Sequence, residues 1–392
     1  MIMVKRPIGH DALAMHPEAP SSANREEAIV YWPMASYQDV HNYKDPGEIP
    51  KNLARLGYSV KLVIGELHCD NVATEVLQTK NTRRFCLRDN VRELIFLIDA
   101  FRKSKAVSLF LSFNTAPTTL LSAAILKLRF IISRKKGRSR PYAILKLDSD
   151  GDIKRGGFLT FSYNVIALML YSCFYDRIIV ESTCAYEKIV KLPLPRERLK
   201  VVPNGYAEDL YCITEHDPIH RENVIISVSR ISREKSIETL LRAFKTVLAA
   251  YPDWKLEIIG PIDDPGYLSH LIAVIQELGT FQKVKFSGKV DNQYLKAAYR
   301  RSMIFSISSS IESYAISRIE ATVNGLPVVT TNAGCPKDIE GFEVVNVGDV
   351  DALSCKLIEL IENPGRRIDR VKEAQSNILS WKEVVERIIS ED

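Results

Sequence analysis

From residue 224 onward the chain alternates short apolar runs with amphipathic runs, and this alternation constrains the fold more than any other feature. Three strand-like runs and three helical runs follow one another in turn: 224–229, 237–250, 255–260, 267–278, 284–288 and 292–301. A strand followed by a helix and then another strand forms a parallel sheet. The alternation therefore predicts a doubly wound α/β domain, with its loops gathered at the carboxyl ends of the strands.

The first half of the chain begins with the same pattern in a looser form. A strand-like run at 28–33 precedes a short helical run at 50–56, which Gly57 ends, and a second strand-like run at 58–64. These runs predict a βαβ unit. A length of 392 residues is too great for one ordinary domain and suggests two, each of about 180 residues.

Composition places the chain among water-soluble globular proteins, with 46% hydrophobic and 26% charged residues. Its seven cysteines are scattered and odd in number, which argues against a disulfide framework or a zinc site and favours a reducing compartment. The first 27 residues lack an apolar core, so we expect a loose tail without a secretory signal. Residues 156–175 carry no charge but several polar groups, so we expect a buried helix there.

The stretch 302–320 combines the features of a phosphate-binding turn. An apolar strand leads into a Ser-rich turn, and a helical run from Tyr314 to Asn324 is closed by Gly325. Glu312 precedes this helix and Glu320 lies inside it. Free backbone N–H groups at a helix start, beside carboxylates, suit a diphosphate flanked by sugar hydroxyls. The plainer alternative is a strand–turn–helix with two solvated acids.

This stretch resembles the paired-glutamate motif of retaining nucleotide-sugar glycosyltransferases with the GT-B fold, glycosyltransferase family 4 in particular. The resemblance implies that Glu320 holds the nucleotide ribose and that Glu312 lies near the donor sugar. The backbone of Tyr314, Ala315 and Ile316 would approach the phosphates. This sequence departs from the family at residues 313–315, where Ser-Tyr-Ala replaces the usual Gly-Phe-Gly.

Two cations in the loop after the strand 224–229 match the same family. Arg230 and Lys235 correspond to the arginine and lysine that neutralise the departing diphosphate. Both flanking glycines of the family are serines here, Ser229 and Ser236. The alternative is a pair of surface cations in a charged loop.

Further matches bear on the donor. Residues 199–205 resemble the junction between the family's two domains, and they include Asn204. Gly288 and Val290 match the turn whose backbone reads the nucleobase. Gly47 falls near the place of a Gly-rich loop that faces the donor phosphates.

The resemblance implies an α/β protein of GT-B architecture, in which two Rossmann-like, doubly wound domains face a central cleft. We expect a tail over 1–27, an acceptor domain over 28–200 and a donor domain over 201–372. A last helix over 373–392 would cross back and pack on the first domain.

Acidic residues end the strand-like run 141–147. Asp148 or Asp150 would take the place of a histidine that many family members carry there, and we count Asp148 among the catalytic residues. The alternative is an Asx-type turn. The pair also matches the metal-binding Asp-x-Asp of the other large glycosyltransferase class, GT-A.

A basic segment distinguishes the first domain. No acidic residue occurs from Ala100 to Leu147, and an apolar run at 120–132 is followed by five cations: Arg134, Lys135, Lys136, Arg138 and Arg140. A solvated loop and an anionic membrane surface are the main alternatives. The run lacks interleaved aromatic residues, so we do not expect nucleic-acid binding.

The resemblance implies a retaining, metal-independent glycosyltransferase without a cofactor. It would move a sugar from a nucleotide-diphosphate sugar to a lipid-linked or glycan acceptor. We expect it in the cytoplasm, with a peripheral location on the inner face of the membrane as an open option. The alternatives are a catalytically silent nucleotide-sugar-binding subunit and a metal-dependent enzyme that uses Asp148 and Asp150.

Overall fold

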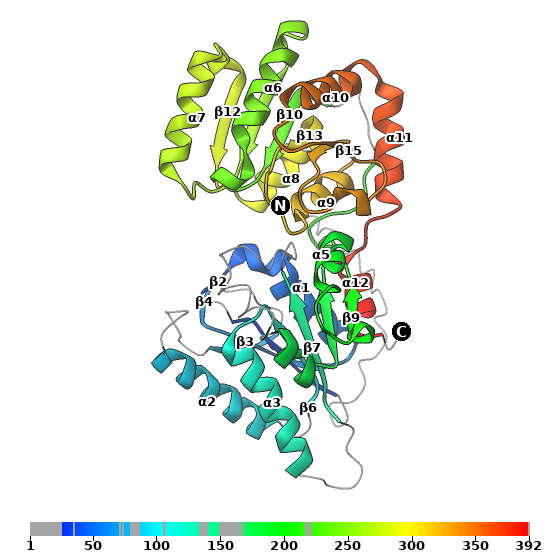
Figure 1. Ribbon diagram of the computed structural model, residues 1–392. Coiled ribbons are helices and arrows are strands. Elements are labelled where there is room, and N and C mark those ends of the chain that lie inside the picture. Colours follow the sequence, from blue (N-terminus) through cyan, green and yellow to red (C-terminus); the bar gives the residue numbers. More distant parts are fainter. Residues whose placement is uncertain are drawn as a thin grey trace, which may run out of the picture.

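The protein consists of two α/β domains, one above the other in the view of Figure 1. The structure, a computed structural model, describes residues 26–390 except 34–35, 70–71, 73, 79–86, 105–106, 133–139, 149–165, 167 and 216–220. The first domain carries the sheet built from residues before 202, and the second domain carries the sheet built from residues after 221.

The first domain is built on a seven-stranded sheet with the order β5-β3-β1-β6-β7-β8-β9. All its strand pairs are parallel, as the βαβ pattern predicted. The strands are β1 (Glu27–Tyr31), β3 (Ser59–Ile64), β5 (Glu75–Gln78), β6 (Val107–Phe113), β7 (Tyr142–Leu147), β8 (Arg177–Val180) and β9 (Leu199–Val201). Two short strands, β2 (Ser36–Gln38) and β4 (Glu66–His68), pair separately.

Helices cover both faces of this sheet. The helices of this domain are α1 (Asp45–Arg55), α2 (Leu87–Lys103), α3 (Pro117–Ile132) and α5 (Thr183–Ile189), and residues 168–174 are also helical. Side chains of α1 pack into the core on one face, and side chains of α2, α3, α5 and 168–174 pack into the core on the other. Two 3₁₀ helices complete the domain, η1 (Asp39–Tyr43) and η2 (Arg196–Arg198).

The second domain has a six-stranded parallel sheet with the order β12-β11-β10-β13-β14-β15. Its strands are β10 (Glu222–Val228), β11 (Lys255–Ile259), β12 (Val284–Gly288), β13 (Ser302–Ile307), β14 (Val328–Thr331) and β15 (Glu343–Val345). Its helices are α6 (Ile237–Ala250), α7 (Pro265–Glu277), α8 (Asn292–Arg301), α9 (Ile316–Val323), α10 (Val350–Glu362) and α11 (Pro364–Gln375), with 3₁₀ helices η4 (Arg233–Lys235), η5 (Phe281–Lys283) and η6 (Pro336–Asp338). The doubly wound prediction is confirmed.

Each sheet reverses its strand order at one point, and there the connections on the two sides diverge. The reversal lies between β1 and β6 in the first sheet, and between β10 and β13 in the second. Open α/β sheets bind ligands in the crevice outside the carboxyl ends of the strands at such a point. A ligand site in the second domain is therefore expected at the loops after β10 and β13.

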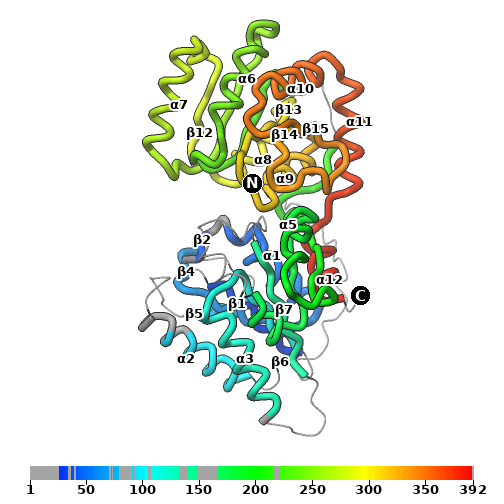
Figure 2. The backbone as a smooth tube through the Cα atoms, in the orientation of Figure 1, coloured from blue at the N-terminus to red at the C-terminus, as the bar shows by residue number. Residues whose placement is uncertain are grey.

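The end of the chain crosses back to the first domain, as predicted, but through two helices. We expected one last helix over 373–392, and this was wrong, because α11 ends at Gln375 and α12 (Trp381–Ile389) begins after a break. Ser380 and Glu383 form a capping box at the start of α12. The helix α12 packs beside α1 in the first domain (Figure 2). The side chains of Trp381, Val384, Val385 and Ile388 belong to the core that α1 covers.

One disulfide links the two domains, between Cys184 of α5 and Cys335 before η6. The scattered cysteines argued against a disulfide framework, and this pair was not foreseen because 151 residues separate its members. Among the residues that the structure describes, Cys173, Cys212 and Cys355 carry free thiols.

The uncharged run at 156–175 is described only in part. Within it, Leu168, Tyr171 and Tyr175 are buried, whereas Met169 and Leu170 are 41% and 45% exposed. In the part of the chain that the structure describes, no helix combines the length and apolar character needed to cross a membrane. The expected tail over 1–27 lies almost wholly outside the described residues.

Candidate active site

The loops after β10 and β13 are fastened to each other by serine hydroxyls. The Ser308 hydroxyl donates to the carbonyl oxygen of Ser236 at 2.8 Å, and the Ser310 main-chain N–H donates to the carbonyl oxygen of Glu234 at 2.8 Å. The Ser-rich turn predicted from sequence therefore bridges two loops at the reversal point of the sheet. It brings together residues that are more than 70 positions apart.

Lys235 and Glu312 meet at this junction. The Lys235 ammonium donates to Glu312 Oε1 at 2.7 Å, and the Ser309 hydroxyl donates to the same oxygen at 2.7 Å. The two charged side chains are 12% and 10% exposed, so the pair is largely removed from water. Charge-assisted hydrogen bonds in such an environment are short and directional. Two of the predicted site residues thus lie in direct contact.

Arg230 lies at the same loop but is directed away from this pair. Its guanidinium donates to Asp263 Oδ2 at 2.7 Å and to Glu234 Oε1 at 3.1 Å. The side chain is 55% exposed. Of the two cations predicted to neutralise the diphosphate, Lys235 therefore contacts Glu312, whereas Arg230 is paired with two surface carboxylates.

Two residues of this site keep a backbone conformation that normally requires glycine. Ser236 has φ 45° and ψ 41°, and Ala315 has φ 60° and ψ 74°, both in the left-handed region. They occupy positions where the resembling family carries glycine. A non-glycine residue held there costs on the order of 1–3 kcal/mol. Both positions thus keep the left-handed backbone, although serine and alanine replace the glycines of the resembling family.

The helix start at α9 leaves its backbone available, because the large side chain there is turned into the core. Tyr314 is 6% exposed and packs in the cluster that contains Ile307 and Ile319. Burial raises the pKa of its hydroxyl. The aromatic ring therefore does not cover the first turn of α9, where Ala315 and Ile316 are partly exposed.

A buried cation that the sequence reading left without a role holds this region together. The Arg318 guanidinium donates to the carbonyl oxygens of Tyr314 (2.6 Å), Ala333 (3.2 Å) and Gly334 (3.1 Å). Burial lowers the pKa of Arg318 to about 10. The sequence signal was its spacing, since Arg318 follows Tyr314 by four positions within the helical run predicted over 314–324 and such residues share one helix face.

Glu320 lies on α9 at the side that faces the first domain. Its Oε2 accepts a hydrogen bond from the Tyr299 hydroxyl at 3.0 Å. Burial raises the pKa of the Glu320 carboxyl, while the positive charge of Lys44 acts against that rise. Lys44 precedes α1 in the first domain, so a cation of one domain and a carboxylate of the other act on each other across the interface.

The turn expected to read the nucleobase lies at the end of a strand, whereas the glycine expected in a phosphate-facing loop lies inside a helix. Gly288 ends β12 with φ 65°, and Val290 packs against the core beside it. Gly47 lies inside the first turn of α1, where a Cβ would come within 2.5 Å of the His41 carbonyl oxygen. This glycine is thus required for packing of η1 against α1.

The pKa of His41 is lowered to about 4 by burial, and then by the positive charges of Lys44 and of Lys289 in the second domain.

A buried charge cluster at the carboxyl ends of β7 and β8 was missed from sequence. Lys146 Nζ donates to Glu181 Oε1 at 2.5 Å and to Asp45 Oδ2 at 3.1 Å, and Asn204 Nδ2 donates to the same Glu181 oxygen at 2.9 Å. Lys146 and Glu181 are at most 1% exposed. Burial raises the pKa of Glu181. Burial would lower that of Lys146, but the surrounding carboxylates outweigh it and raise the pKa.

A signal for this cluster existed in the sequence. Lys146 is the one cation in an otherwise apolar strand, and Glu181 directly follows another apolar strand. A buried charge is stable only when it is paired and hydrogen-bonded. Asn204, predicted to be near the donor, instead contacts Glu181 through its amide nitrogen, while its Oδ1 and Glu181 Oε2 are buried without a protein hydrogen-bond partner.

Asp148 connects the two domains. Its Oδ1 accepts a hydrogen bond from the Ser313 hydroxyl at 2.9 Å, and its main-chain N–H donates to Asn114 Oδ1 at 3.2 Å. Because Ser313 is the neighbour of Glu312, Asp148 lies beside the predicted sugar position. Asp150 lies outside the described residues, as do Arg134, Lys135, Lys136 and Arg138. Arg140 is described and is paired with Asp176 at 2.5 Å.

The segment that contains Lys235 and Glu312 is similar in sequence to a known family, and the whole fold is similar to solved structures. Residues 214–377, most of the second domain, match the family Glycosyl transferases group 1. HepE of Anabaena, solved with UDP and glucose, superposes with a TM-score of 0.68 at 16% identity, covering 93% of this chain and 98% of that one. The match extends over both domains.

The chain has the GT-B fold. The predicted architecture of two Rossmann-like domains with a returning helix is thereby confirmed.

Two curated relatives share sequence with this GT-B protein. An uncharacterized glycosyltransferase of Methanocaldococcus jannaschii is 26% identical over 256 residues, which are 60% of this chain and 65% of that protein. The GDP-mannose-dependent monoacylated alpha-(1-6)-phosphatidylinositol monomannoside mannosyltransferase of Corynebacterium glutamicum is 30% identical over 178 residues, 42% of this chain and 45% of that protein. The chain thus spans about half to two thirds of the length of these relatives.

The left-handed residues of the site lead to a prediction about stability. Ser236→Gly should stabilise the second domain by about 1 kcal/mol, because relief of the strained backbone exceeds the greater flexibility of glycine in the unfolded chain. The hydrogen bond from Ser308 uses the main-chain oxygen of residue 236 and is kept. Urea unfolding followed by circular dichroism measures the change.

Ser236→Ala is the matched control, because it removes the hydroxyl but keeps the strained backbone. Its stability should stay within about 0.5 kcal/mol of the unaltered protein. Equal stabilisation by both substitutions would mean that the hydroxyl, and not the left-handed backbone, is the source of the cost.

Proposed function

We propose that this protein is a retaining glycosyltransferase of family 4. It would move a sugar from a nucleotide-diphosphate sugar to a lipid-linked or glycan acceptor, in the synthesis of a glycoconjugate or a cell-surface polysaccharide. The observation that carries the proposal is the contact of Lys235 with Glu312 at the reversal point of the second sheet, within the segment that matches Glycosyl transferases group 1.

The proposed mechanism relies on preorganised charge. Lys235, joined by Arg230 once that side chain leaves its surface carboxylates, would stabilise the negative charge that develops on the departing diphosphate. The first turn of α9 would add backbone donors at Ala315 and Ile316. Glu320 would hold the ribose and Glu312 the transferred sugar. The diphosphate itself would take the proton of the acceptor hydroxyl, so that no catalytic histidine is required.

The kind of donor and acceptor is supported by what the similar proteins are named for. One structural neighbour was solved with UDP and glucose, and one relative is a GDP-mannose-dependent enzyme that acts on a phosphatidylinositol mannoside. Both are consistent with a nucleoside diphosphate in the second domain. The second is consistent with an acceptor that carries a lipid.

A silent binding subunit is the competing proposal. The serine and alanine at glycine positions favour it, because changed residues are expected where activity has been lost. The retained left-handed backbone at Ser236 and Ala315 and the intact contact of Lys235 with Glu312 favour an enzyme.

A panel of UDP-, GDP- and ADP-sugars with membrane lipid extracts as acceptors tests the proposal. Release of the nucleoside diphosphate together with a glycosylated product is the expected result. Proton NMR of the product then gives the anomeric configuration, which should match that of the donor. Binding of a nucleoside diphosphate, seen as a rise in melting temperature, without any transfer would establish the silent subunit instead.

Lys235 should be essential for turnover. Lys235→Ala should lower kcat by about 10²-fold or more, because a cation aimed at the leaving diphosphate contributes a few kcal/mol to the transition state. Arg233→Ala is a matched control, since this neighbouring cation is 71% exposed and pairs with Asp264. Equal turnover of the folded Lys235→Ala protein and the unaltered protein would remove this lysine from the mechanism.

We propose that no metal ion is required, because the two cations take its place at the diphosphate. Activity should therefore survive EDTA. Loss of activity on chelation with recovery in Mn²⁺ or Mg²⁺ would favour the metal-dependent alternative at Asp148 and Asp150. In that case Asp148→Asn should abolish both activity and its metal dependence.

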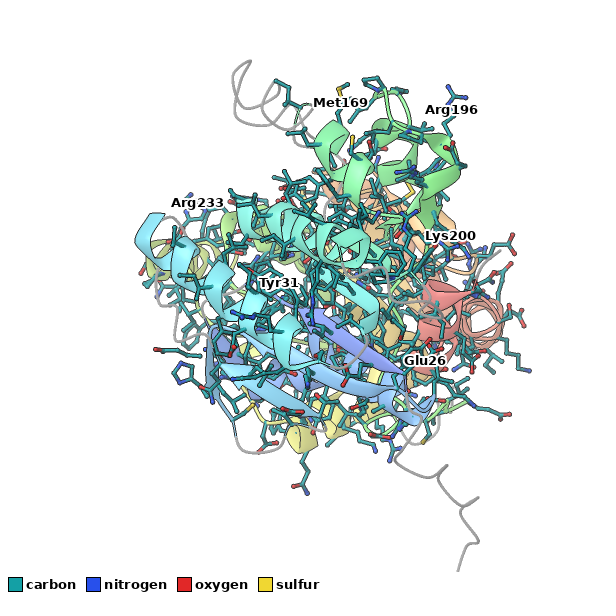
Figure 3. The ribbon with its side chains drawn as sticks, turned by 90° about the horizontal axis from the view of Figure 1, so that it is seen from below. Glu26, Tyr31, Met169, Arg196, Lys200 and Arg233 are labelled. Carbon is teal, nitrogen blue, oxygen red and sulfur yellow. A yellow bond between two sulfur atoms is a disulfide. The ribbon has the colours of Figure 1, made fainter. Side chains whose placement is uncertain are left out.

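We also propose that the first domain works against the inner face of the membrane. Apolar side chains on three neighbouring segments are 41–61% exposed: Val91, Ile95, Leu121, Leu128, Ile131, Ile166, Met169 and Leu170. They lie on α2, on α3 and on the helical segment that contains Met169, which is labelled in Figure 3. The basic run that follows α3 would add about 1 kcal/mol for each cation near an anionic surface.

Flotation with liposomes tests this placement. The protein should float with anionic liposomes at low salt and be released at high salt. Neutralising Arg134, Lys135, Lys136, Arg138 and Arg140, or combining Leu128→Ser with Ile131→Ser, should reduce recovery. Phe281→Ser is the control, because this residue is 63% exposed on the second domain. Equal recovery with neutral liposomes would refute the electrostatic part of the proposal.

A further inference from the structure

The disulfide between Cys184 and Cys335 is a covalent tie across the interface of the two domains. Cys184 lies in the first turn of α5, which follows the sheet of the first domain, and Cys335 lies between β14 and η6 of the second. Their Cα atoms are 5.6 Å apart. A bond in this position limits how far the domains can separate.

Polar contacts accompany the bond on both sides. The Thr183 main-chain N–H donates to Asp338 Oδ2 at 2.8 Å, and the Thr183 hydroxyl donates to the other oxygen of that carboxylate. Lys337 and Glu187 approach to 3.4 Å but are about three-fifths exposed. Such exposed polar contacts exchange readily with water, so of the contacts between α5 and the turn at η6 the disulfide is the one that persists when the domains move apart.

The second-domain end of the bond rests on the residues of the proposed donor site. Arg318 holds the carbonyl oxygens of Ala333 and Gly334, directly before Cys335, against the start of α9. Gly334 also lies against Glu312, since a Cβ at Gly334 would come within 2.6 Å of the Glu312 Cβ. A displacement of Cys335 would therefore also displace the backbone beside Glu312.

We propose that Cys184 and Cys335 form a reversible redox latch, which restrains the two domains when oxidised and frees them when reduced. A dithiol reductant would supply the two electrons. Its thiolate attacks the Cys184 sulfur, which is the more exposed of the two, and breaks the bond to Cys335. Its second thiol then displaces Cys184, which leaves two protein thiols and an oxidised, disulfide-bonded reductant.

The surroundings of Cys335 accommodate both states. Asp338 Oδ1 lies 3.3 Å and the Thr183 hydroxyl 3.2 Å from its sulfur. The thiol released by reduction therefore has an acceptor in place. Regulation by this latch rests on the proposed function, because turnover requires the cleft to open for donor entry and for release of the nucleoside diphosphate.

The test uses the full chain in oxidising and in reducing thiol buffer. Alkylation and peptide mass mapping should find a peptide that joins Cys184 to Cys335 in the oxidised sample alone. Small-angle scattering should show a larger radius of gyration after reduction, and turnover should rise severalfold. Cys184→Ser should show the reduced values in both buffers. Cys355→Ser, which removes a free exposed thiol, should behave as the unaltered protein does.

Two outcomes would overturn the latch. One is the absence of the linked peptide in oxidising buffer, and the other is a linked peptide with unchanged scattering on reduction. Both readouts need no transfer reaction, so they test the latch even if the protein transfers no sugar. If peptide and scattering change as expected while transfer is absent, the latch stands and the proposed function fails.

Discussion

A buried guanidinium organises the part of the second domain that faces the first domain. Arg318 is held by three main-chain carbonyl oxygens from two separate segments, the start of α9 and the turn that leads to Cys335. Burying such a charge is costly unless its donors are satisfied, so the two segments are kept in one arrangement as long as the cation stays inside. The Glu312 loop, the helix start and the disulfide all depend on that arrangement.

The first domain places a comparable charge cluster at the matching edge of its own sheet. Lys146 is surrounded by Glu181 and Asp45, and Glu181 also accepts from Asn204 of the connection between the domains. Removing one partner of such a group leaves an uncompensated buried charge, which costs far more than the pair itself contributes. Each domain is thus fixed by a buried cation, Lys146 in strand β7 and Arg318 in helix α9.

The parts of this structure that could be predicted from sequence are those decided by local pattern. The helices over 237–250 and 292–301 have their predicted bounds, because apolar periodicity and flanking loops determine them within a few residues. The break before α12 was missed, since the last two helices together read as one periodic run. It is produced by main-chain hydrogen bonds to Tyr206, 170 residues and more away, which no local pattern encodes.

In the candidate site, too, the features that depend on local sequence motifs could be predicted and those that depend on distant contacts could not. Lys235 and Glu312 could be named from the motifs that carry them, and the structure brings them to 2.7 Å. The direction of Arg230 could not be foreseen, because it depends on Asp263 in a loop of another strand. The left-handed backbone at Ser236 and Ala315 was also hidden, since serine and alanine give no signal for positive φ. The link between Cys184 and Cys335 follows only from the packing of two domains.

The chain passes between the domains twice, and the two passages are joined side by side. The Tyr206 N–H donates to the Leu379 carbonyl oxygen at 3.0 Å, and the Trp381 N–H donates to the Tyr206 carbonyl oxygen at 3.1 Å. Gly205 permits this close approach, because a Cβ there would come within 2.8 Å of the Ser380 backbone. Two joined passages resist torsion and sliding far more than bending. A relative rotation of the domains that keeps both main-chain hydrogen bonds must therefore pivot near Tyr206 and Ser380.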